Sequence, residues 1–277
     1  MHAKKKLGQH FLSNKNILNT MVDVAEISKS DTVLEAGPGT GTLTEILAER
    51  AKKVIAVEKD RDLIPFLKEK FRNKKNIEIV EGDILNLTPP LSFVRRGSKY
   101  KIVANIPYYI TSHFLRKFLE GKNKPELMVL MVQKEVAERI VARDGRESLL
   151  SLSVKAYGEP EIIKIVPRGA FSPPPKVDSA IIKITTSPRA TRPLLRKERE
   201  DVDSSPSPLR RGKGLGVRGL KDSEIEQILS VARIAFQKKR KMLRQSIGKK
   251  INLPKQYETR RPEELSLEDW LKILKSG

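Results

Sequence analysis

A short segment near the middle of the chain combines residue types that could hold an aromatic base by its amino group. In KIVANIPYYI, residues 101–110, strand-forming residues end abruptly in Asn105, Ile106, Pro107 and Tyr108. The side-chain carbonyl of Asn105 and the backbone carbonyl of Pro107 can accept hydrogen bonds from an exocyclic amino group, and Tyr108 offers a ring for stacking. Proline also fixes the turn and has no backbone donor. These residues predict a site that works by positioning, without a strong general base.

A glycine-rich segment, VLEAGPGTGTLT at residues 33–44, carries the second chemical signal. Gly37, Gly39 and Gly41 would let a ligand approach the backbone closely. The segment lacks the last glycine of the dinucleotide fingerprint in either reading frame, and no Gly-Lys-Ser/Thr of a phosphate-binding loop follows. The remaining pattern, E-x-G-x-G-x-G between a strand and a helix, resembles the cofactor loop of S-adenosylmethionine-dependent methyltransferases.

Two carboxylates close the strands predicted to follow this loop. Glu58 ends VIAVE, and Asp83 ends IEIVEGD. An acid at the end of the second strand can accept both hydroxyls of a ribose, as in dinucleotide-binding folds. A carboxylate at the end of the third strand could accept from the amino group of adenine. Because successive strand ends carry these residue types, we expect one nucleoside site there.

Alternating strand and helix patterns would position these residues. Strand-forming runs are separated by segments such as TLTEILAERA, whose apolar residues have helical spacing. This alternation predicts an α/β fold with a parallel sheet, helices on both faces and a ligand site at the carboxyl ends of the strands. With the glycine loop, it indicates a Rossmann-like methyltransferase fold. Strands are expected at residues 32–37, 53–59, 77–83, 101–106, 127–133, 161–166 and 177–185.

Composition divides the chain into three parts. Residues 1–187 hold the predicted Rossmann-like domain with a basic N-terminal arm. Residues 188–221 are rich in Pro, Gly, Ser and Arg, which predicts a flexible basic linker or insertion. An RNA-contacting arm that becomes ordered on binding is the alternative for this segment. Residues 222–277 are predicted to form a small helical C-terminal domain.

Two amphipathic helices are expected in that C-terminal domain. Apolar residues recur at helical spacing from Ile225 through Leu243, and the polar side of this helix ends in the basic run KKRKMLR. In the second helix, Ser266 is a candidate N-cap and Trp270 a candidate core anchor.

The charge of the chain indicates its partners. The 55 Lys and Arg residues outnumber 34 Asp and Glu residues, which gives a net charge of +21. Such an excess favours nucleic acid or an anionic membrane, because neutralising phosphates releases counterions. The chain has no cysteine, which fits a reducing, cytoplasmic compartment. Its three histidines lack metal-ligand spacing and no apolar run reaches a membrane-spanning length, so we expect neither a metal nor a membrane partner.

Five segments together resemble the rRNA adenine N6,N6-dimethyltransferase family, and most closely its bacterial small-subunit members. They are LGQHFLSNKNIL (7–18), LEAGPGTGTLT, NIPYYITS (105–112), MVQKEVAERI (131–140) and AFSPPPKVDSAII (170–182). The resemblance covers nearly the whole chain except residues 186–221. It implies S-adenosyl-L-methionine as the methyl donor and N6 of adenine as the acceptor, where acceptors such as Asn105 and Pro107 would aim the nitrogen lone pair at the methyl group.

The resemblance also implies roles for particular side chains. Phe171 matches the aromatic residue proposed to cover the target base opposite Tyr108. Many relatives have Asn at the position of His10, which would border the cofactor together with Leu12. The family's cofactor positions correspond to His10, Leu12, Gly37, Glu58, Asp83 and Asn105, beside the loop glycines Gly39 and Gly41.

The target base must leave its stack to enter such a pocket, so single-stranded or loop RNA is the expected substrate. Basic residues of the N-terminal arm and of residues 238–244 would then hold the RNA backbone. They are Lys4, Lys5, Lys6, Lys238, Lys239, Arg240, Lys241 and Arg244.

We therefore expect a cytoplasmic, monomeric enzyme that dimethylates adenines, two of them adjacent, in a loop near the 3′ end of small-subunit (16S) rRNA on the 30S particle during ribosome biogenesis. Three alternatives remain. A large-subunit rRNA methyltransferase is disfavoured by FSPPPKVDSA and by the C-terminal helices. A DNA adenine methyltransferase usually carries a separate target-recognition domain. A non-catalytic assembly or transcription factor is disfavoured by the intact Asn105, Pro107, Tyr108, Glu58 and Asp83.

Overall fold

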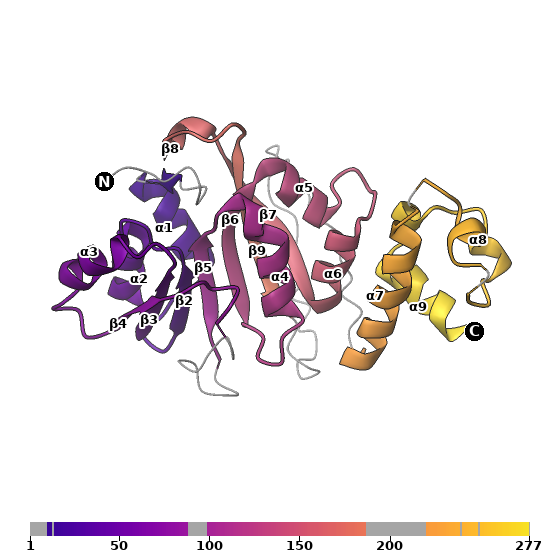
Figure 1. Ribbon diagram of the computed structural model, residues 1–277, viewed down its shortest axis with the longest axis horizontal. Coiled ribbons are helices and arrows are strands. Elements are labelled where there is room, and N and C mark those ends of the chain that lie inside the picture. The colour runs from indigo at the N-terminus through magenta and orange to yellow at the C-terminus, as the bar shows by residue number, and fades with distance from the viewer. Residues whose placement is uncertain are drawn as a thin grey trace, which may run out of the picture.

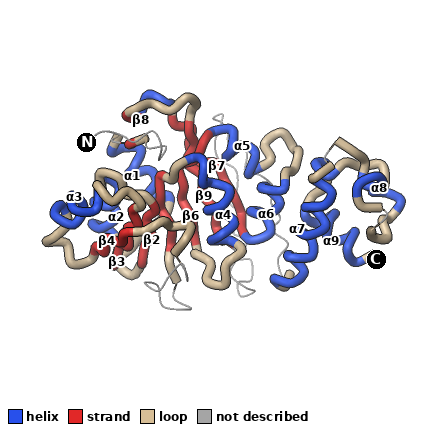
Figure 2. The backbone as a smooth tube through the Cα atoms, viewed as in Figure 1, coloured by secondary structure: helices blue, strands red, loops and turns tan. Residues whose placement is uncertain are grey.

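The computed structural model describes residues 10–87, 99–186 and 220–276, apart from residues 13, 239 and 249. A seven-stranded sheet lies at the centre, with helices on both of its faces and a further group of helices at one end (Figure 1). Figure 2 distinguishes the strands from the helices that cover them. The α/β fold predicted from the alternating pattern is therefore confirmed.

The sheet has the strand order β4-β3-β2-β5-β6-β9-β7. Its strands are β2 (Thr32–Ala36), β3 (Lys53–Glu58), β4 (Ile77–Glu81), β5 (Lys101–Asn105), β6 (Leu127–Gln133), β7 (Gly158–Val166) and β9 (Ser179–Thr186). The strands from β4 to β6 are parallel to their neighbours, as expected. In contrast, β9 runs antiparallel between β6 and β7, so the sheet is mixed. This reversal places residues 167–178, which join β7 to β9, at the same edge as the carboxyl ends of the parallel strands.

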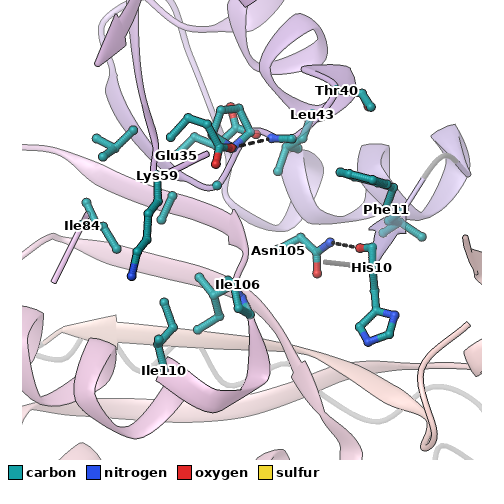
Figure 3. Close-up of a pocket in the computed structure, with 18 of the residues that line it drawn as sticks. His10, Phe11, Glu35, Thr40, Leu43, Lys59, Ile84, Asn105, Ile106 and Ile110 are labelled. Atoms are coloured by element: carbon teal, nitrogen blue, oxygen red, sulfur yellow. Dashed lines mark hydrogen bonds between the residues drawn. The ribbon is translucent and has the colours of Figure 1, made fainter. Parts of the chain in front are cut away.

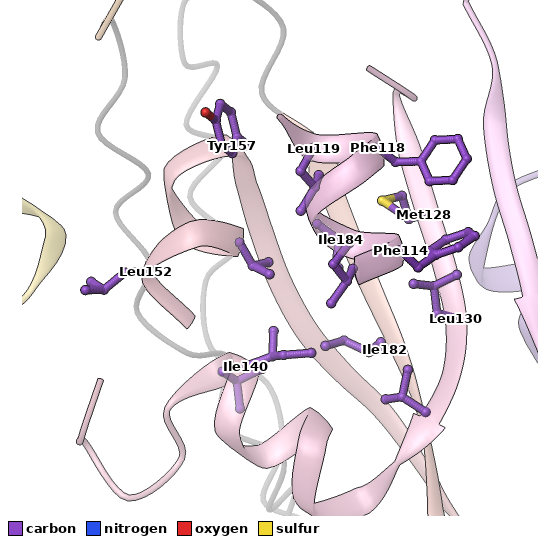
Figure 4. Close-up of a cluster of buried hydrophobic side chains, with 14 of the residues drawn as sticks. Phe114, Phe118, Leu119, Met128, Leu130, Ile140, Leu152, Tyr157, Ile182 and Ile184 are labelled. Atoms are coloured by element: carbon purple, nitrogen blue, oxygen red, sulfur yellow. The ribbon is translucent and has the colours of Figure 1, made fainter. Parts of the chain in front are cut away.

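Hydrophobic residues on both faces explain why the sheet is buried. Successive strand residues point to opposite sides. On one side, Leu34 and Ile102 belong to a cluster that includes residues of α4, α5 and α6 (Figure 4). On the other side, Val33 and Val103 pack with α1 and α2. The helices are α1 (Lys15–Val24), α2 (Thr42–Arg50), α3 (Leu63–Lys70), α4 (Thr111–Leu119), α5 (Lys134–Val141) and α6 (Leu149–Tyr157).

A two-stranded ribbon joins the start of the described chain to the segment after β7. Strand β1 (Phe11–Leu12) pairs antiparallel with β8 (Phe171–Ser172), so that Leu12 lies opposite Phe171. Both of these side chains are buried in the cluster that contains α1 and α2. Neither strand is expected from sequence, because two residues are too few to show a strand period. The ribbon brings two distant motifs to the same edge of the sheet.

The C-terminal helices are α7 (Asp222–Phe236), α8 (Leu243–Ser246) and α9 (Leu267–Lys275). The predicted anchor Trp270 is fully buried in the same hydrophobic cluster as Leu152 of α6. Ser266 caps α9 as expected, because its side chain accepts a hydrogen bond from the Asp269 amide at 3.2 Å. The helices therefore share a continuous core with the sheet. The three-part division stays a prediction, and most of the proposed linker lies outside the described residues.

The helix expected to continue through Leu243 is shorter than the sequence period indicates. It ends at Phe236, and residues 237, 238 and 240 lie in turns before α8. Tertiary bonds account for the break: the Leu243 amide donates to the Arg260 carbonyl at 2.8 Å, and the Arg244 amide donates to the Glu258 carbonyl at 3.1 Å. Among the described residues, none of the helices has both the length and the apolar character needed to cross a membrane.

We expect Trp270→Ala to lower the free energy of unfolding by about 3–5 kcal/mol, because it leaves a cavity in the core shared by α6, α7 and α9. Urea denaturation followed by circular dichroism measures this change. Lys272→Ala, at an exposed position of the same helix, is the matched control and should change stability by less than about 0.5 kcal/mol. Equal stability of the two variants would contradict the shared core.

Candidate active site

A pocket opens where the parallel strands β2, β3 and β5 end (Figure 3). It is lined by the glycine turn after β2, the residues that close β3, β4 and β5, and the short β1 segment. Parallel strands direct their carboxyl ends to one edge, so the residues that close them converge there. Of the residues predicted to bind the cofactor, the pocket brings together His10, Leu12, Gly37, Gly39, Glu58, Asp83 and Asn105. Pro107 and Tyr108 line it as well.

The glycine turn has a backbone that other residues rarely adopt. Gly37, Gly39 and Gly41 have φ values of +68°, +59° and +78°. A Cβ added to Gly37 would meet no atom within 4 Å, so the backbone there borders open space. Gly41 does not line the pocket: a Cβ at this position would lie 2.7 Å from the Phe71 ring. Gly41 was predicted to lie beside the cofactor, but it lies behind the wall of the pocket, at the start of α2.

Glu58 is held by backbone amides from two loops. Its Oε2 accepts a hydrogen bond from the Gly39 amide at 3.1 Å, and its Oε1 accepts from the Asp60 amide at 2.8 Å. Burial raises the pKa of the Glu58 carboxyl, and these backbone bonds partly offset the rise. Each carboxylate oxygen can accept more than one hydrogen bond, so the group retains capacity for hydroxyl donors.

Asp83 is paired with a lysine that the sequence analysis does not single out. Lys59 Nζ donates to Asp83 Oδ2 at 2.8 Å, and the Leu85 amide donates to Oδ1 at 2.9 Å. Burial alone would raise the pKa of Asp83, but the bonds from Lys59 and Leu85 outweigh it and lower the pKa. Figure 3 shows the extended Lys59 side chain among the residues that line the pocket. Its position directly after Glu58 is the sequence signal that could have indicated it.

Glu35 is the second pocket residue that the sequence analysis does not select. It precedes the glycine turn on β2, is 1% exposed, and its Oε2 has no hydrogen-bond partner within the described residues. Burial raises its pKa to about 8, and the negative charge of nearby Glu58 adds to the rise. The carboxyl is therefore mostly protonated at neutral pH. The first letter of E-x-G-x-G-x-G is the signal for this residue.

Asn105 closes β5 in a fixed orientation. Its Nδ2 donates a hydrogen bond to the backbone carbonyl of His10 at 3.1 Å, which Figure 3 shows as a dashed line. Because the amide nitrogen is engaged, the side-chain oxygen is left as the acceptor toward the pocket. The neighbouring Pro107 carbonyl accepts from the Ile110 amide at 3.1 Å, and it has a second lone pair.

Tyr108 is held at its hydroxyl and lies beside His10. The hydroxyl is 2.6 Å from Ser179 Oγ, and burial raises the pKa of the phenol. The Tyr108 and His10 rings are stacked, with centroids 5.9 Å apart and an interplanar angle of 22°. Phe171, predicted to face Tyr108, is 4% exposed, packs in the cluster of α1 and α2, and is not one of the residues that line the pocket.

The predicted RNA-binding residues lie far from the pocket where they are described. Lys238, Arg240, Lys241 and Arg244 are exposed, in or next to the turn between α7 and α8. In Figure 1 this turn is at the opposite end of the molecule from β3 and β4. Lys4, Lys5, Lys6 and Lys239 lie outside the described residues. Within the part of the chain that the structure describes, no group of three or more His, Asp or Glu residues is placed to hold a metal ion.

We expect Glu35→Gln to stabilise the protein increasingly as the pH rises. Between the ordinary pKa of 4.5 and about 8, the folded wild type keeps a proton on Glu35 that the unfolded chain has lost. Wild-type stability therefore falls with pH, by up to about 1.4 kcal/mol per pH unit, relative to a glutamine that cannot ionise. Chemical denaturation of both proteins across this pH window measures the difference. Glu49→Gln, at an exposed position of α2, is the control, and a pH-independent difference for Glu35→Gln would show that the carboxyl is ionised.

Comparison with known proteins identifies the family. The family model described as ribosomal RNA adenine dimethylase matches residues 1–198. A ribosomal RNA small subunit methyltransferase A from Dehalococcoides mccartyi is 41% identical over 281 aligned residues, which cover 98% of this chain and 87% of that protein.

Two solved structures are similar over almost the whole chain. A dimethyladenosine transferase from Plasmodium falciparum has a TM-score of 0.73 and 28% identity, covering 96% of this chain and 97% of that one. The 23S rRNA methyltransferase ErmE has a TM-score of 0.71 and 26% identity, covering 96% and 98%. The glycine turn, the fixed Asn105 and the similarity along the whole sequence lead to one conclusion: the chain belongs to the ribosomal RNA adenine dimethylase family.

Proposed function

We propose that this protein transfers two methyl groups in succession from S-adenosyl-L-methionine to N6 of adenine in small-subunit rRNA. The observation that carries the proposal is the orientation of Asn105, whose amide nitrogen is held by the His10 carbonyl at 3.1 Å. The side-chain oxygen is thereby available to accept a hydrogen bond from an amino group in the pocket. Family membership and the small-subunit relative that matches 98% of the chain support the substrate.

The pocket fits the proposed methyl donor. The open backbone at Gly37 leaves room for a ligand, Glu58 offers carboxylate oxygens to a ribose, and Asp83 can accept from an adenine amino group. When bound, S-adenosyl-L-methionine supplies an electrophilic methyl group on a sulfonium that leaves readily. The chain holds this nucleoside by its strand ends. The protonated Glu35 avoids a second buried negative charge next to Glu58.

Asn105 and Pro107 prepare the acceptor nitrogen. The N6 lone pair of adenine is delocalised into the ring, so the nitrogen is a weak nucleophile. Acceptance of its two N–H groups by the Asn105 side chain and the Pro107 carbonyl favours a pyramidal nitrogen with its lone pair directed at the methyl group. As the N–C bond forms the carbon–sulfur bond breaks, a neutral thioether leaves, and the nitrogen then releases one proton to water. One N–H remains after this first transfer, and one of the two acceptors is sufficient to orient it. Tyr108, held by Ser179, gives the base a fixed ring to stack on.

The distribution of basic residues supports an extended RNA substrate. Exposed basic residues between α7 and α8 lie at the opposite end of the molecule from β3 and β4, so an RNA that contacts both would be much larger than one nucleotide. This arrangement supports a large folded RNA as the substrate. By the resemblance to small-subunit members of the family, we propose two adjacent adenines in a loop near the 3′ end of small-subunit rRNA as the targets. We propose that the protein acts there as a cytoplasmic monomer.

Large-subunit rRNA is the second candidate substrate, because the 23S rRNA methyltransferase ErmE has a TM-score of 0.71 to this chain.

A methyl-transfer assay distinguishes small-subunit from large-subunit rRNA as the substrate. Purified protein and radiolabelled S-adenosyl-L-methionine are incubated with unmethylated small subunits, large-subunit rRNA or DNA, and the labelled nucleosides are identified. We expect N6,N6-dimethyladenosine from small subunits alone. If the label is found in large-subunit rRNA or DNA, that nucleic acid is the substrate instead. If no nucleic acid is labelled although the protein still binds S-adenosyl-L-methionine, a role as a non-catalytic assembly factor is favoured.

Glu58→Ala should weaken the binding of S-adenosyl-L-methionine by roughly tenfold or more, because it removes the carboxylate proposed to hold the ribose. Isothermal titration calorimetry measures the affinity. Glu81→Ala is a matched control, since Glu81 lies directly beside Glu58 in the β3–β4 register but is exposed and outside the pocket. An equal loss in both variants would argue against a specific ribose contact.

Asn105→Ala should reduce kcat by about 10²–10³-fold, because it removes an acceptor that acts on the reacting nitrogen. Binding of small-subunit RNA, measured by filter retention, should remain within about threefold of wild type, since backbone contacts supply most of the affinity. Full activity of this variant would refute the proposed activation of N6.

A further inference from the structure

We propose that Lys117 is a positioning residue that sets Asp83 to accept the amino group of the methyl donor's adenine. This inference rests on the proposed function and adds to the site a lysine that does not itself line the pocket. Lys117 is half-buried in the last turn of α4, the helix that starts directly after the turn at Tyr108. Its side chain reaches the loop after β4 and donates two hydrogen bonds to backbone carbonyls there.

Asp83 belongs to a single turn of chain, residues 83–87, that follows β4. The Asn86 amide donates to the Asp83 carbonyl at 2.8 Å, and the Leu87 amide donates to the same carbonyl at 3.1 Å. The Asp83 side chain closes the start of this turn, because its Oδ1 accepts from the Leu85 amide at 2.9 Å. The direction of the carboxylate therefore follows the orientation of the whole turn.

Lys117 closes the other end of the turn. Its Nζ donates to the Leu85 carbonyl at 2.6 Å and to the Leu87 carbonyl at 2.9 Å. The carbonyls at the end of a helical turn have no partner within it and carry a partial negative charge, which an ammonium group complements. Asp83 and Lys117 thus place opposite charges at the two ends of the turn. Without Lys117, the turn would lose its hydrogen bonds to α4.

Hydrophobic contacts hold the same turn against the core but do not set its direction. Ile84 is buried, and Leu85 and Leu87 pack against the cluster that includes residues of α4. Burial of apolar surface is non-directional, whereas a hydrogen bond weakens steeply as its angle becomes unfavourable. We therefore expect a protein without the Lys117 amine to fold, with a carboxylate at residue 83 that is less precisely directed.

The charge of Lys117 also acts on Asp83. Burial raises the pKa of Asp83, but hydrogen bonds from Lys59 and Leu85 lower it. The positive charge of Lys117 lowers it further. An ionised carboxylate forms stronger hydrogen bonds with an amino group than a neutral acceptor does. Lys117 therefore supports both the direction and the charge of this acceptor.

The turn lies at the end of the pocket away from the proposed acceptor nitrogen. In Figure 3, Ile84 lies to one side of Asn105 and His10 lies to the other. Ile84 directly follows Asp83, so the turn is apart from the groups that hold the target amino group. Loss of the Lys117 amine should therefore change the KM for S-adenosyl-L-methionine and leave kcat almost unchanged.

Two substitutions at Lys117 and one control test the inference. Lys117→Met removes the charge and the donors, Lys117→Arg keeps both, and Arg116→Met removes a charge from the exposed neighbouring position. Calorimetry measures the binding of S-adenosyl-L-homocysteine. Competition against this ligand measures the binding of its 6-deamino analogue, which carries hydrogen in place of the amino group. The analogue cannot donate to Asp83, so it reports the effects that do not pass through this acid.

We expect Lys117→Met to weaken the binding of S-adenosyl-L-homocysteine by about tenfold, in the range of one lost hydrogen bond to a charged group. Binding of the deamino analogue should weaken by less than about threefold, and Lys117→Arg and Arg116→Met should bind both ligands within about threefold of wild type. In the methyl-transfer assay with saturating RNA, Lys117→Met should raise the KM for S-adenosyl-L-methionine by about tenfold and keep kcat within about twofold.

Three outcomes would overturn the inference: wild-type affinity of Lys117→Met for S-adenosyl-L-homocysteine, an equal loss for both ligands, or the same loss in Arg116→Met. The second would reduce Lys117 to a general structural role. Failure of the proposed function is seen separately, because the wild type would then bind S-adenosyl-L-homocysteine without labelling RNA, and the affinities would still test Lys117. If the wild type binds neither ligand, the inference falls with the proposed function.

Discussion

The hydrogen bond from the Asn105 side chain to the His10 carbonyl is the constraint on which the site depends. It joins residues 95 positions apart and fixes which atom of the amide faces the pocket. It can form only because the β1–β8 ribbon brings the start of the described chain to the end of β5. The ribbon in turn depends on the antiparallel β9, which leaves the segment after β7 at the active edge of the sheet. The direction of one strand thus determines the orientation of one amide.

The three pocket acids show how a single edge of a sheet can hold carboxyl groups in different states. Glu35 is buried with its Oε2 unpaired among the described residues, and its raised pKa keeps it mostly protonated at neutral pH, which avoids the cost of a buried charge. Glu58 is buried but bonded to backbone amides of two loops. Asp83 is neutralised by Lys59. Each carboxyl group has different hydrogen-bond partners, because a different loop follows each strand. The local chain therefore sets the protonation state of each acid.

The sequence predicts the parallel strands and their ligand edge well, because hydrophobic runs and closing polar residues are local properties. It predicts neither the antiparallel direction of β9 nor the β1–β8 pairing, because both depend on contacts between distant segments. The end of α7 at Phe236 also depends on contacts between distant segments, because the amides of Leu243 and Arg244 donate to the carbonyls of residues 260 and 258. Glu35 and Lys59 stood inside recognised motifs, but their burial and pairing arise only when the strands assemble.

Both ends of the segment between β9 and α7 are anchored to one turn before β6. The Thr186 amide donates to the Glu126 carbonyl at 3.1 Å, and Asp222 at the start of α7 forms an ion pair with Lys124 at 3.6 Å. This turn is at the amino ends of the parallel strands, opposite the pocket. Extra residues inserted there begin and end at nearly the same point, and the entropy of closing such a loop grows only slowly with its length. Residues can therefore be inserted between β9 and α7 without displacing the edge of the sheet that carries the pocket.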